Sequence, residues 1–359
     1  MTWAEVCYNA ERDGLTAIAN SLKNLRFSLE TESMRAITFS TPGGPEVLQL
    51  TEVPDPTPGP EQLLVRVRAS ALNRADTLQR RGQYPPPPGE SDILGLELAG
   101  EVEAVGTAAQ GFGVVDRVFG LVGGGGYAEK ALIDYRMAMP IPAGWSFVEA
   151  AAVPEVFFTA HETLFTLGQL APGETVLIHA GASGVGTAGI QMARHIGARV
   201  FATAGSPEKV AQITALGAAV GINYKTEDFA ARVRALTNRS GVDLVQDFVG
   251  AAYWQSNLQC LKVGGRLVLV GLMGGAKVEA DLGLILRQRL HIIGSVMRSQ
   301  SLENKIAITQ RFRERWLPLL AKGSIRPIID TSFALAEAAA AHKYMEDNRN
   351  VGKIMLVVD

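Results

Sequence analysis

A glycine-rich turn at residues 180–186 constrains the fold of this 359-residue chain more than any other feature. The turn follows an apolar segment, residues 175–179, whose β-branched side chains predict a strand. It precedes residues 186–196, whose apolar positions have helical spacing. A strand, a tight turn of small residues and a helix, in this order, are typical of the first unit of a parallel α/β sheet.

The chain after the turn continues the same alternation. Five further apolar runs of strand length lie at residues 199–203, 220–224, 243–248, 266–270 and 290–294. Two of the helical segments, 186–196 and 206–216, end at Gly197 and Gly217, which suit a left-handed cap. Strands that alternate with helices predict a doubly wound parallel sheet over residues 152–294.

The turn itself indicates a dinucleotide-binding site. Small residues let the backbone approach a pyrophosphate, and the helix N-terminus offers free N–H groups to its charge. Ser183 stands where the fingerprint G-x-G-x-x-G has its second glycine, so it would either block this approach or bond a phosphate through its hydroxyl. A purely structural turn is the alternative. The residues expected at the site are Gly181, Ser183, Gly184, Val185 and Gly186.

The end of the second strand favours NADP(H) over NAD(H). NAD sites usually have an acidic residue there, but no acid follows residues 199–203 before Glu208. Ser206 follows the strand instead, and Lys209 and Tyr224 offer an ammonium and a phenol that could meet a 2′-phosphate. The alternative for Lys209 is an ordinary exposed helix lysine.

The rest of the chain has a different pattern. Short β-branched runs broken by glycine and proline over residues 34–151 predict an antiparallel β domain. Residues 295–359, with an Ala-rich helix at 335–347 and a strand at 353–358, are expected to rejoin this domain. Residues 1–33 are either a short amphipathic extension or the product of an in-frame start upstream of Met34. Four prolines at 85–88 hold Tyr84 on a stiff segment, which suits a pocket rim; a half-buried tyrosine in a solvent-side turn is the alternative.

Composition excludes several classes of function. With 34 Lys and Arg against 36 Asp and Glu, the formal net charge is −2, so the chain lacks the basic surface that nucleic-acid binding needs. Its 47% hydrophobic and 19% charged residues indicate a compact globular protein. Two cysteines, Cys7 and Cys260, are too few for a disulfide framework or a four-thiolate zinc site. Neither a membrane anchor nor a signal peptide is expected, so a reducing, cytoplasmic location is predicted.

Several motifs together carry a family resemblance. They include Gly-Gly-Pro-Glu-Val-Leu at 43–48, Asn-Arg-Ala-Asp at 73–76, Gln-Tyr-Pro-Pro-Pro-Pro-Gly at 83–89, Leu-Gly-Leu-Glu at 94–97 and Asn-Val-Gly-Lys-Ile at 350–354. From Met34 onward the chain resembles the zinc-free quinone oxidoreductases related to zeta-crystallin, a branch of the medium-chain dehydrogenase/reductase superfamily. Ala-Gly-x-Ser-Gly-Val-Gly at the turn and Asn-Tyr-Lys at 223–225 are most similar to its tumour-suppressor-inducible members and their bacterial relatives. The resemblance implies an α/β fold with a Pro/Gly-rich, GroES-like β domain beside an NADP(H)-binding Rossmann domain.

Three positions mark departures within that superfamily. Zinc-bearing members have a cysteine near Asn73 and a histidine at position 96, but Asn73 and Leu96 supply neither thiolate nor imidazole, so no catalytic metal is expected. Val115 replaces a glycine that relatives usually have. A positive φ at this valine would cost about 1 kcal/mol or more.

The resemblance implies an NADPH-dependent reductase of quinones or similar conjugated carbonyls, which accept hydride without a metal. Tyr84 and Asn73 are the expected hydrogen-bond donors to the acceptor oxygen. The residues expected to line the nicotinamide and the rest of the cofactor channel are Thr159, Gly250, Gly271, Leu272, Met273 and Lys353. Structural alternatives are a turn contact for Asn73, a helix cap for Thr159 and a solvated strand face for Lys353.

Two other functions remain open, and an oligomer is expected. An enoyl-thioester or alkenal reductase would use a basic pocket rim for a CoA phosphate, and Arg74, Arg80 and Arg81 are candidates for it. A structural or RNA-associated protein that binds NADPH without turnover is the more distant alternative. The apolar segment 290–294 would form a sheet edge, which predicts a homodimer through that strand.

Overall fold

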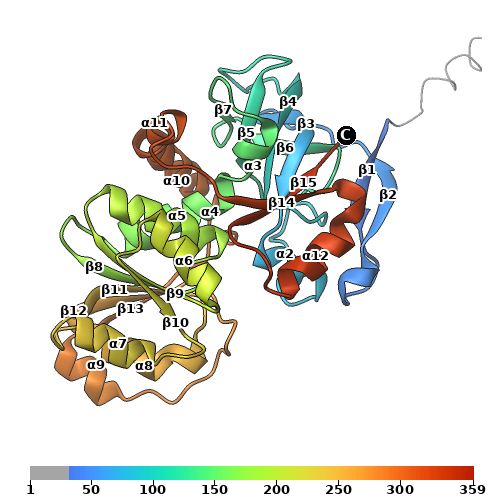
Figure 1. Ribbon diagram of the computed structural model, residues 1–359. Helices are drawn as coiled ribbons and strands as arrows, with labels where there is room; N and C mark the ends of the chain where they lie inside the picture. Colours follow the sequence, from blue (N-terminus) through green and yellow to red (C-terminus); the bar gives the residue numbers. More distant parts are fainter. Residues whose placement is uncertain (1–31) are drawn as a thin grey trace, which may run out of the picture.

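The structure is a computed structural model that describes residues 32–359, so nearly all of the predicted N-terminal extension lies outside it. Two bodies are visible in Figure 1: a sheet flanked by helices, coloured green to orange, and a β-rich body coloured blue to cyan. The last elements of the chain, in red, lie in the β-rich body, whereas the brown-red helices of residues 302–321 lie beside the helix-flanked body.

The helix-flanked body is built on one six-stranded sheet in the order β10-β9-β8-β11-β12-β13, with every neighbouring pair parallel. This confirms the predicted doubly wound sheet, because the chain reverses its direction of winding between β8 and β11. The strands are β8 (Thr175–Ile178), β9 (Arg199–Ala204), β10 (Val220–Asn223), β11 (Val242–Asp247), β12 (Leu261–Leu269) and β13 (His291–Gly294). Only β12 differs clearly from its predicted bounds, since it begins five residues earlier, at Leu261.

Helices cover both faces of this sheet. They are α5 (Gly184–His195), α6 (Pro207–Leu216), α7 (Phe229–Leu236), α8 (Trp254–Cys260) and α9 (Leu282–Gln288). Successive side chains of β8 enter different cores: Val176 and Ile178 join one buried cluster and Leu177 joins another. Gly197 and Gly217 have φ values of 85° and 119°, as the predicted left-handed caps require.

The β-rich body contains a seven-stranded sheet and a hairpin. The sheet has the order β14-β15-β3-β4-β5-β7, with β6 paired to β3, and the hairpin joins β1 to β2. The strands are β1 (Ser33–Thr38), β2 (Gln49–Pro54), β3 (Gln62–Ala71), β4 (Glu97–Val105), β5 (Arg117–Leu121), β6 (Lys130–Asp134), β7 (Met139–Pro140), β14 (Ile329–Ala334) and β15 (Lys353–Val357). Because β15 pairs antiparallel with β3, the C-terminal segment does rejoin this body as predicted.

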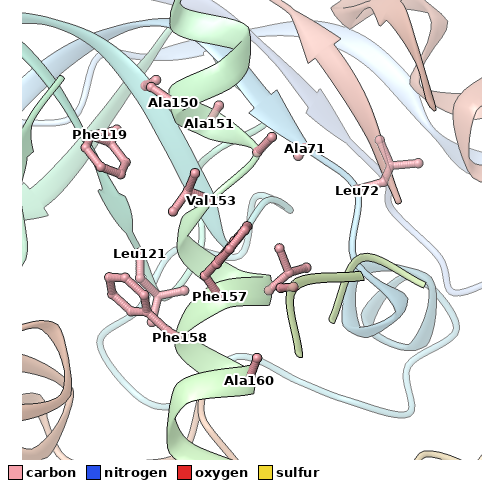
Figure 2. Close-up of a cluster of buried hydrophobic side chains, with 14 of the residues drawn as sticks. Ala71, Leu72, Phe119, Leu121, Ala150, Ala151, Val153, Phe157, Phe158 and Ala160 are labelled. Atoms are coloured by element: carbon pink, nitrogen blue, oxygen red, sulfur yellow. The ribbon is translucent and has the colours of Figure 1, made fainter. Parts of the chain in front are cut away.

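Short helices complete the β-rich body and connect the two bodies. They are η1 (Pro45–Val47), α2 (Arg74–Arg80), α3 (Phe147–Ala151), α4 (Pro154–His161), η2 (Glu162–Leu167), α10 (Leu302–Arg315), α11 (Leu317–Ala321), η4 (Leu335–Glu337) and α12 (Ala338–Glu346), whereas η3 (Ala251–Tyr253) lies between β11 and α8 in the helix-flanked body. Among them α4 contacts α5 of one body and β5 of the other. Figure 2 shows Phe157 and Phe158 of α4 among buried side chains of β5 and α3. The domain limits at residues 151/152 and 294/295 stay predictions.

Candidate functional site

The β-rich body contains a cluster of buried polar side chains, Glu97, Asn73 and Lys353, called the polar cluster below. A buried ion pair lies at its centre. Nζ of Lys353, on β15, lies 2.6 Å from Oε1 of Glu97, on β4, and the two side chains are 3% and 0% exposed. The same ammonium donates to the carbonyl oxygen of Leu72 at 2.9 Å and to Oδ1 of Asn73 at 2.8 Å. All three N–H donors of Lys353 are therefore used inside the protein, which rules out the solvated strand face as its location.

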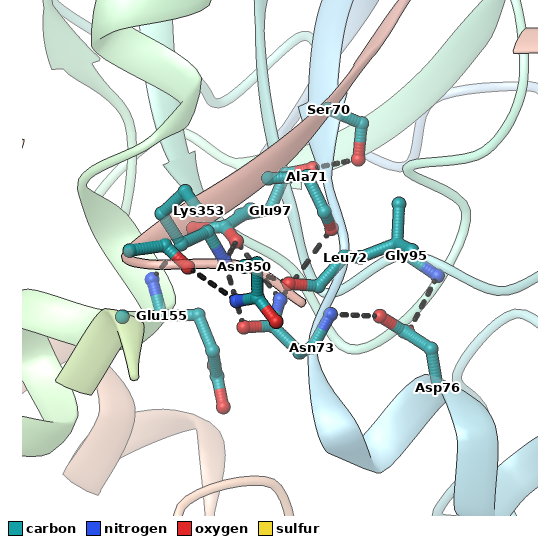
Figure 3. Close-up of polar contacts among 12 residues, drawn as sticks. Ser70, Ala71, Leu72, Asn73, Asp76, Gly95, Glu97, Glu155, Asn350 and Lys353 are labelled. Carbon is teal, nitrogen blue, oxygen red and sulfur yellow. Dashed lines mark hydrogen bonds and ion pairs between the residues drawn. The ribbon is translucent and has the colours of Figure 1, made fainter. Parts of the chain in front are cut away.

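The carboxylate of Glu97 accepts two further hydrogen bonds. Oε1 accepts from Nδ2 of Asn73 at 2.8 Å, and Oε2 accepts from the backbone N–H of Glu155 at 2.8 Å. Glu97 thus ties β4 to β15, to the start of α2 and to the start of α4 (Figure 3). A buried charge is tolerated only when it is paired and hydrogen-bonded in this way.

Asn73, one of the two predicted donors, is held by these contacts. Its side chain donates to Glu97 and, at 3.5 Å, to the carbonyl oxygen of Ala71. Its backbone N–H donates to the buried carboxyl of Asp76 at 2.7 Å, and burial raises the pKa of that carboxyl to about 6. A direct bond from Asn73 to an acceptor would compete with Glu97 and Ala71, so its predicted role stays a prediction.

Tyr84, the other predicted donor, lies partly buried before the proline-rich segment. Arg298 fixes this region: its guanidinium donates to the carbonyl oxygen of Gly123 at 2.7 Å, to Oε1 of Gln79 at 2.8 Å and to the carbonyl oxygen of Tyr84 at 3.4 Å. The same guanidinium lies 5.6 Å from the centre of the Tyr84 ring. Burial raises the pKa of Tyr84, and the nearby Glu155 carboxyl adds to the rise.

Sequence reasoning missed Arg298 and the partner of Lys353. Arg298 lies in the connection between β13 and α10 and is 5% exposed, yet no local pattern distinguishes it from a surface arginine. Glu97 was part of the motif Leu-Gly-Leu-Glu but had no predicted role. A glutamate at the start of an otherwise apolar strand was the one signal that could have found it.

The glycine-rich turn lies against this polar cluster. Ser183 caps α5, because its Oγ accepts the N–H of Gly186 at 3.0 Å, and its O–H is left to donate. A Cβ on Gly184 would lie 2.9 Å from Cδ of Lys353, and one on Gly186 would lie 2.4 Å from the carbonyl oxygen of Ala180. Glycine is therefore required at both positions, and the turn and Lys353 are in contact.

The same turn suits a pyrophosphate. Gly181 donates its N–H to the carbonyl oxygen of Thr203, which closes the turn onto β9. The N–H of Val185, in the first turn of α5, meets no acceptor within residues 32–359. A free N–H and the Ser183 hydroxyl at a helix N-terminus are the donors that a phosphate accepts from.

The three residues predicted around a 2′-phosphate come together beside β9. Oγ of Ser206 accepts the backbone N–H of Lys209 at 3.3 Å and so caps α6. Nζ of Lys209 donates to the carbonyl oxygens of Asn348 and Asn350 at 2.7 and 2.8 Å, so this ammonium is anchored rather than free in solvent. A Cβ on Gly205 would lie 2.7 Å from the hydroxyl of Tyr224, which places that phenol over the end of β9.

The remaining predicted cofactor contacts follow the carboxyl ends of β11 and β12, except Thr159, which is buried within α4. Gly250 has φ 80°, and both its N–H and that of Val249 donate to the carboxylate of Asp247. Gly271, Leu272 and Met273 follow β12, and Leu272 and Met273 are each more than half exposed. In an open parallel sheet, ligands bind at this edge of the strands, next to the switch point.

Among residues 32–359, no three His, Cys, Asp or Glu side chains gather in a way that could hold a metal ion. No helix there is both long and apolar enough to cross a membrane.

Comparison with known proteins agrees with this architecture. Residues 59–143 match the family model "Alcohol dehydrogenase GroES-like domain", and residues 184–313 match "Zinc-binding dehydrogenase". A quinone oxidoreductase of Pseudomonas aeruginosa is 36% identical over 328 residues, which cover 90% of this chain and 99% of the relative. The phthioceranic/hydroxyphthioceranic acid synthase of Mycobacterium tuberculosis is 32% identical over 340 residues, 90% of this chain but 15% of the synthase.

Solved structures show the same likeness. The quinone oxidoreductase of Pseudomonas syringae pv. tomato is 34% identical with a TM-score of 0.82, and the match covers 90% of this chain and 99% of that one. The Escherichia coli quinone oxidoreductase, solved in complex with NADPH, is 30% identical with a TM-score of 0.83 and the same coverage. The chain belongs to the medium-chain dehydrogenase/reductase superfamily of oxidoreductases. Its relatives of similar length include quinone oxidoreductases, as the sequence motifs predicted.

Proposed function

We propose that this protein reduces quinones, or similar conjugated carbonyl compounds, with NADPH and without zinc. The observation that carries the proposal is the contact between the glycine-rich turn and Lys353. This contact supports a dinucleotide site at the carboxyl edge of the sheet, beside the polar cluster of Glu97, Asn73 and Lys353. Relatives named quinone oxidoreductase match over nearly their whole length, and one is solved with NADPH.

Preference for NADPH is supported by Lys209. The ammonium is anchored between two backbone carbonyls, next to Ser206 and Tyr224, so little entropy remains to be lost when it meets a 2′-phosphate. Burial lowers the pKa of Lys209, the nearby Asp330 carboxylate opposes this, and the cations Arg74 and Lys225 add to the lowering. Repulsion among these cations is relieved when a phosphate dianion binds between them.

A zinc-independent reaction is supported by the way Glu97 is used. Its carboxylate already accepts hydrogen bonds from Lys353, Asn73 and the backbone of Glu155. The cation that neutralises this buried carboxylate is therefore the ammonium of Lys353. Bound NADPH would supply the hydride. The protein would hold the acceptor against the nicotinamide and exclude water, with Thr159 on α4 beside the ring and Tyr84 on the opposite rim.

The relatives within polyketide synthases favour a second candidate, reduction of an enoyl thioester or alkenal. One prediction that supported it is wrong: Arg80 is not at a pocket rim, because its side chain is fully buried and pairs with Glu346. Arg81 also pairs with Glu346, and Arg74 bonds Asn348, to which Lys209 also bonds, so Arg74 belongs with the proposed 2′-phosphate site. The distant alternative, binding of NADPH without turnover, becomes an outcome of the test below.

The test compares NADPH and NADH oxidation with an ortho-quinone such as phenanthrenequinone, with an enone and with crotonyl-CoA. We expect quinone turnover with NADPH, and a rise in KM for NADPH but not for NADH in Lys209→Ala. Oxidation with crotonyl-CoA alone would favour the thioester reductase. NADPH binding without oxidation by any acceptor would overturn the enzyme proposal.

A homodimer and a cytoplasmic location belong to the same proposal. β13 forms one edge of the six-stranded sheet, as predicted, so its outer backbone groups are available to a second copy. The neighbouring α9 exposes Leu282 and Leu286 to more than two thirds of their area, an apolar surface that a dimer would cover. Sedimentation velocity of the wild type and of Leu286→Glu tests the dimer.

A further inference from the structure

One carboxyl near the polar cluster has no partner of its own. Glu155 occupies the first turn of α4, and its backbone N–H is bound to Glu97, but its carboxyl makes no hydrogen bond or ion pair with any of residues 32–359. In Figure 3 the side chain extends away from Glu97, Asn73 and Lys353. It therefore takes no part in the network that its own backbone helps to form.

The position of this side chain points to the acceptor. Glu155 and Thr159 are one helical turn apart on α4, so they lie on the same helix face. Thr159 is the residue proposed to lie beside the nicotinamide, and Tyr84 is close enough for Glu155 to raise the pKa of its phenol. The carboxyl is thus near both the residue assigned to the nicotinamide and the residue assigned to the rim.

The charges around Glu155 favour its neutral form. Burial raises the pKa of Glu155 to about 8, with Glu97 on β4 adding to the rise and Asp76 on α2 contributing less. Lys353 on β15 and Arg298 after β13 act in the opposite direction. Tyr84, the other titratable group that faces it, is neutral at this pH. The raised pKa favours a carboxylic acid at this position at neutral pH, and a carboxylic acid has an O–H to donate.

We infer that Glu155 is the general acid that protonates the acceptor oxygen during reduction. The inference rests on the proposed function. Hydride moves with its electron pair from NADPH to the acceptor, negative charge develops on the acceptor oxygen, the O–H bond of Glu155 breaks and a new O–H bond forms on that oxygen. The quinone becomes a hydroquinone, NADPH becomes NADP⁺, and the Glu155 carboxylate regains a proton from water after the product leaves.

Glu155→Gln tests this assignment, because glutamine keeps the shape and can donate a hydrogen bond but cannot release a proton. We expect kcat with the quinone to fall about 100-fold, within the range for loss of a general acid, while KM and NADPH binding by fluorescence change little. In the wild type, kcat should fall as pH rises through about 8. The variant should lack that decline, and Tyr84→Phe should keep it.

Glu162→Gln is the matched control. Glu162 follows α4, is 7% exposed and pairs with Arg311 at 3.2 Å, outside the proposed site, so its loss should leave kcat and the pH profile unchanged. If Glu155→Gln keeps the kcat and the pH profile of the wild type, the inference is overturned. The proposed function would then still stand. If that variant does not fold, a wild-type kcat that stays level between about pH 6 and 10 would overturn it equally. If none of the acceptors supports NADPH oxidation by the wild type, both the proposed function and the inference about Glu155 fail.

Discussion

Replacing Val115 by glycine should stabilise the protein. Val115 has φ 68°, and a β-branched side chain in this left-handed region costs about 1–2 kcal/mol. The side chain is 75% exposed, so little packing is lost on its removal. The turn itself keeps its bonds, since the N–H of residue 115 donates to the carbonyl oxygen of Val102 at 2.8 Å in any residue type.

The opposing term is the greater freedom of glycine in the unfolded chain, about 0.5–1 kcal/mol. The net expectation for Val115→Gly is therefore a gain of about 0.5–1 kcal/mol in the free energy of unfolding. Val114 provides the control, because it is 58% exposed but is not among the residues with positive φ. Val114→Gly should lose about 0.5–1 kcal/mol, since it has the entropy cost without the relief of strain.

Urea denaturation followed by circular dichroism measures both variants against the wild type. The two changes remove the same atoms from adjacent, exposed positions, so a difference between them reports the backbone conformation alone. Equal midpoints for the two variants, or a Val115→Gly protein less stable than the wild type, would refute the reasoning.

Three other perturbations have definite expectations. Lys353→Met should lower the free energy of unfolding by about 3–5 kcal/mol, because Glu97 is left buried without its cation. Adding Glu97→Gln to this variant should restore part of the loss. An unchanged urea midpoint in the single variant would contradict this expectation. Burial and the neighbouring Arg80 lower the pKa of His342 from 6.5 to about 3. As pH falls below 6.5 the unfolded chain gains a proton that the folded one refuses, so the wild type should lose up to about 1.4 kcal/mol per pH unit from this group. His342→Gln should lack that component, and parallel stability curves for the two proteins would count against it. Ser183→Ala should cost about 1 kcal/mol by uncapping α5 and should weaken NADPH binding in a fluorescence titration; unaltered affinity would mean that the hydroxyl does not meet the phosphate.

The features that could be predicted from the sequence are local ones. Periodicity over a few residues sufficed for the six parallel strands, and the positive φ values of Gly197, Gly217 and Val115 follow from the residue types expected at those points. The return of the C-terminal strand to the first body was predicted from the change in pattern after the sixth strand. Each of these depends on neighbours along the chain.

The polar cluster could not be predicted in the same way. Glu97 and Lys353 are 256 residues apart, and Arg298 bonds Gln79 across 219 residues. A single sequence shows which side chains are charged but not which distant partner neutralises them. For the same reason Arg80 was placed at a pocket rim, although its partner Glu346 holds it in the interior.

The separation between Glu97 and Lys353 also affects the order in which the protein is assembled during translation. At about 5–20 residues per second, Glu97 leaves the ribosome roughly 10–50 s before its cation is synthesised. Over that interval β8 to β13 are completed in one continuous stretch, so the parallel sheet can form while β3 still lacks β15 on its other side. Until β15 is synthesised, the nascent β-rich body holds the Glu97 carboxylate without the ammonium that neutralises it in the folded protein.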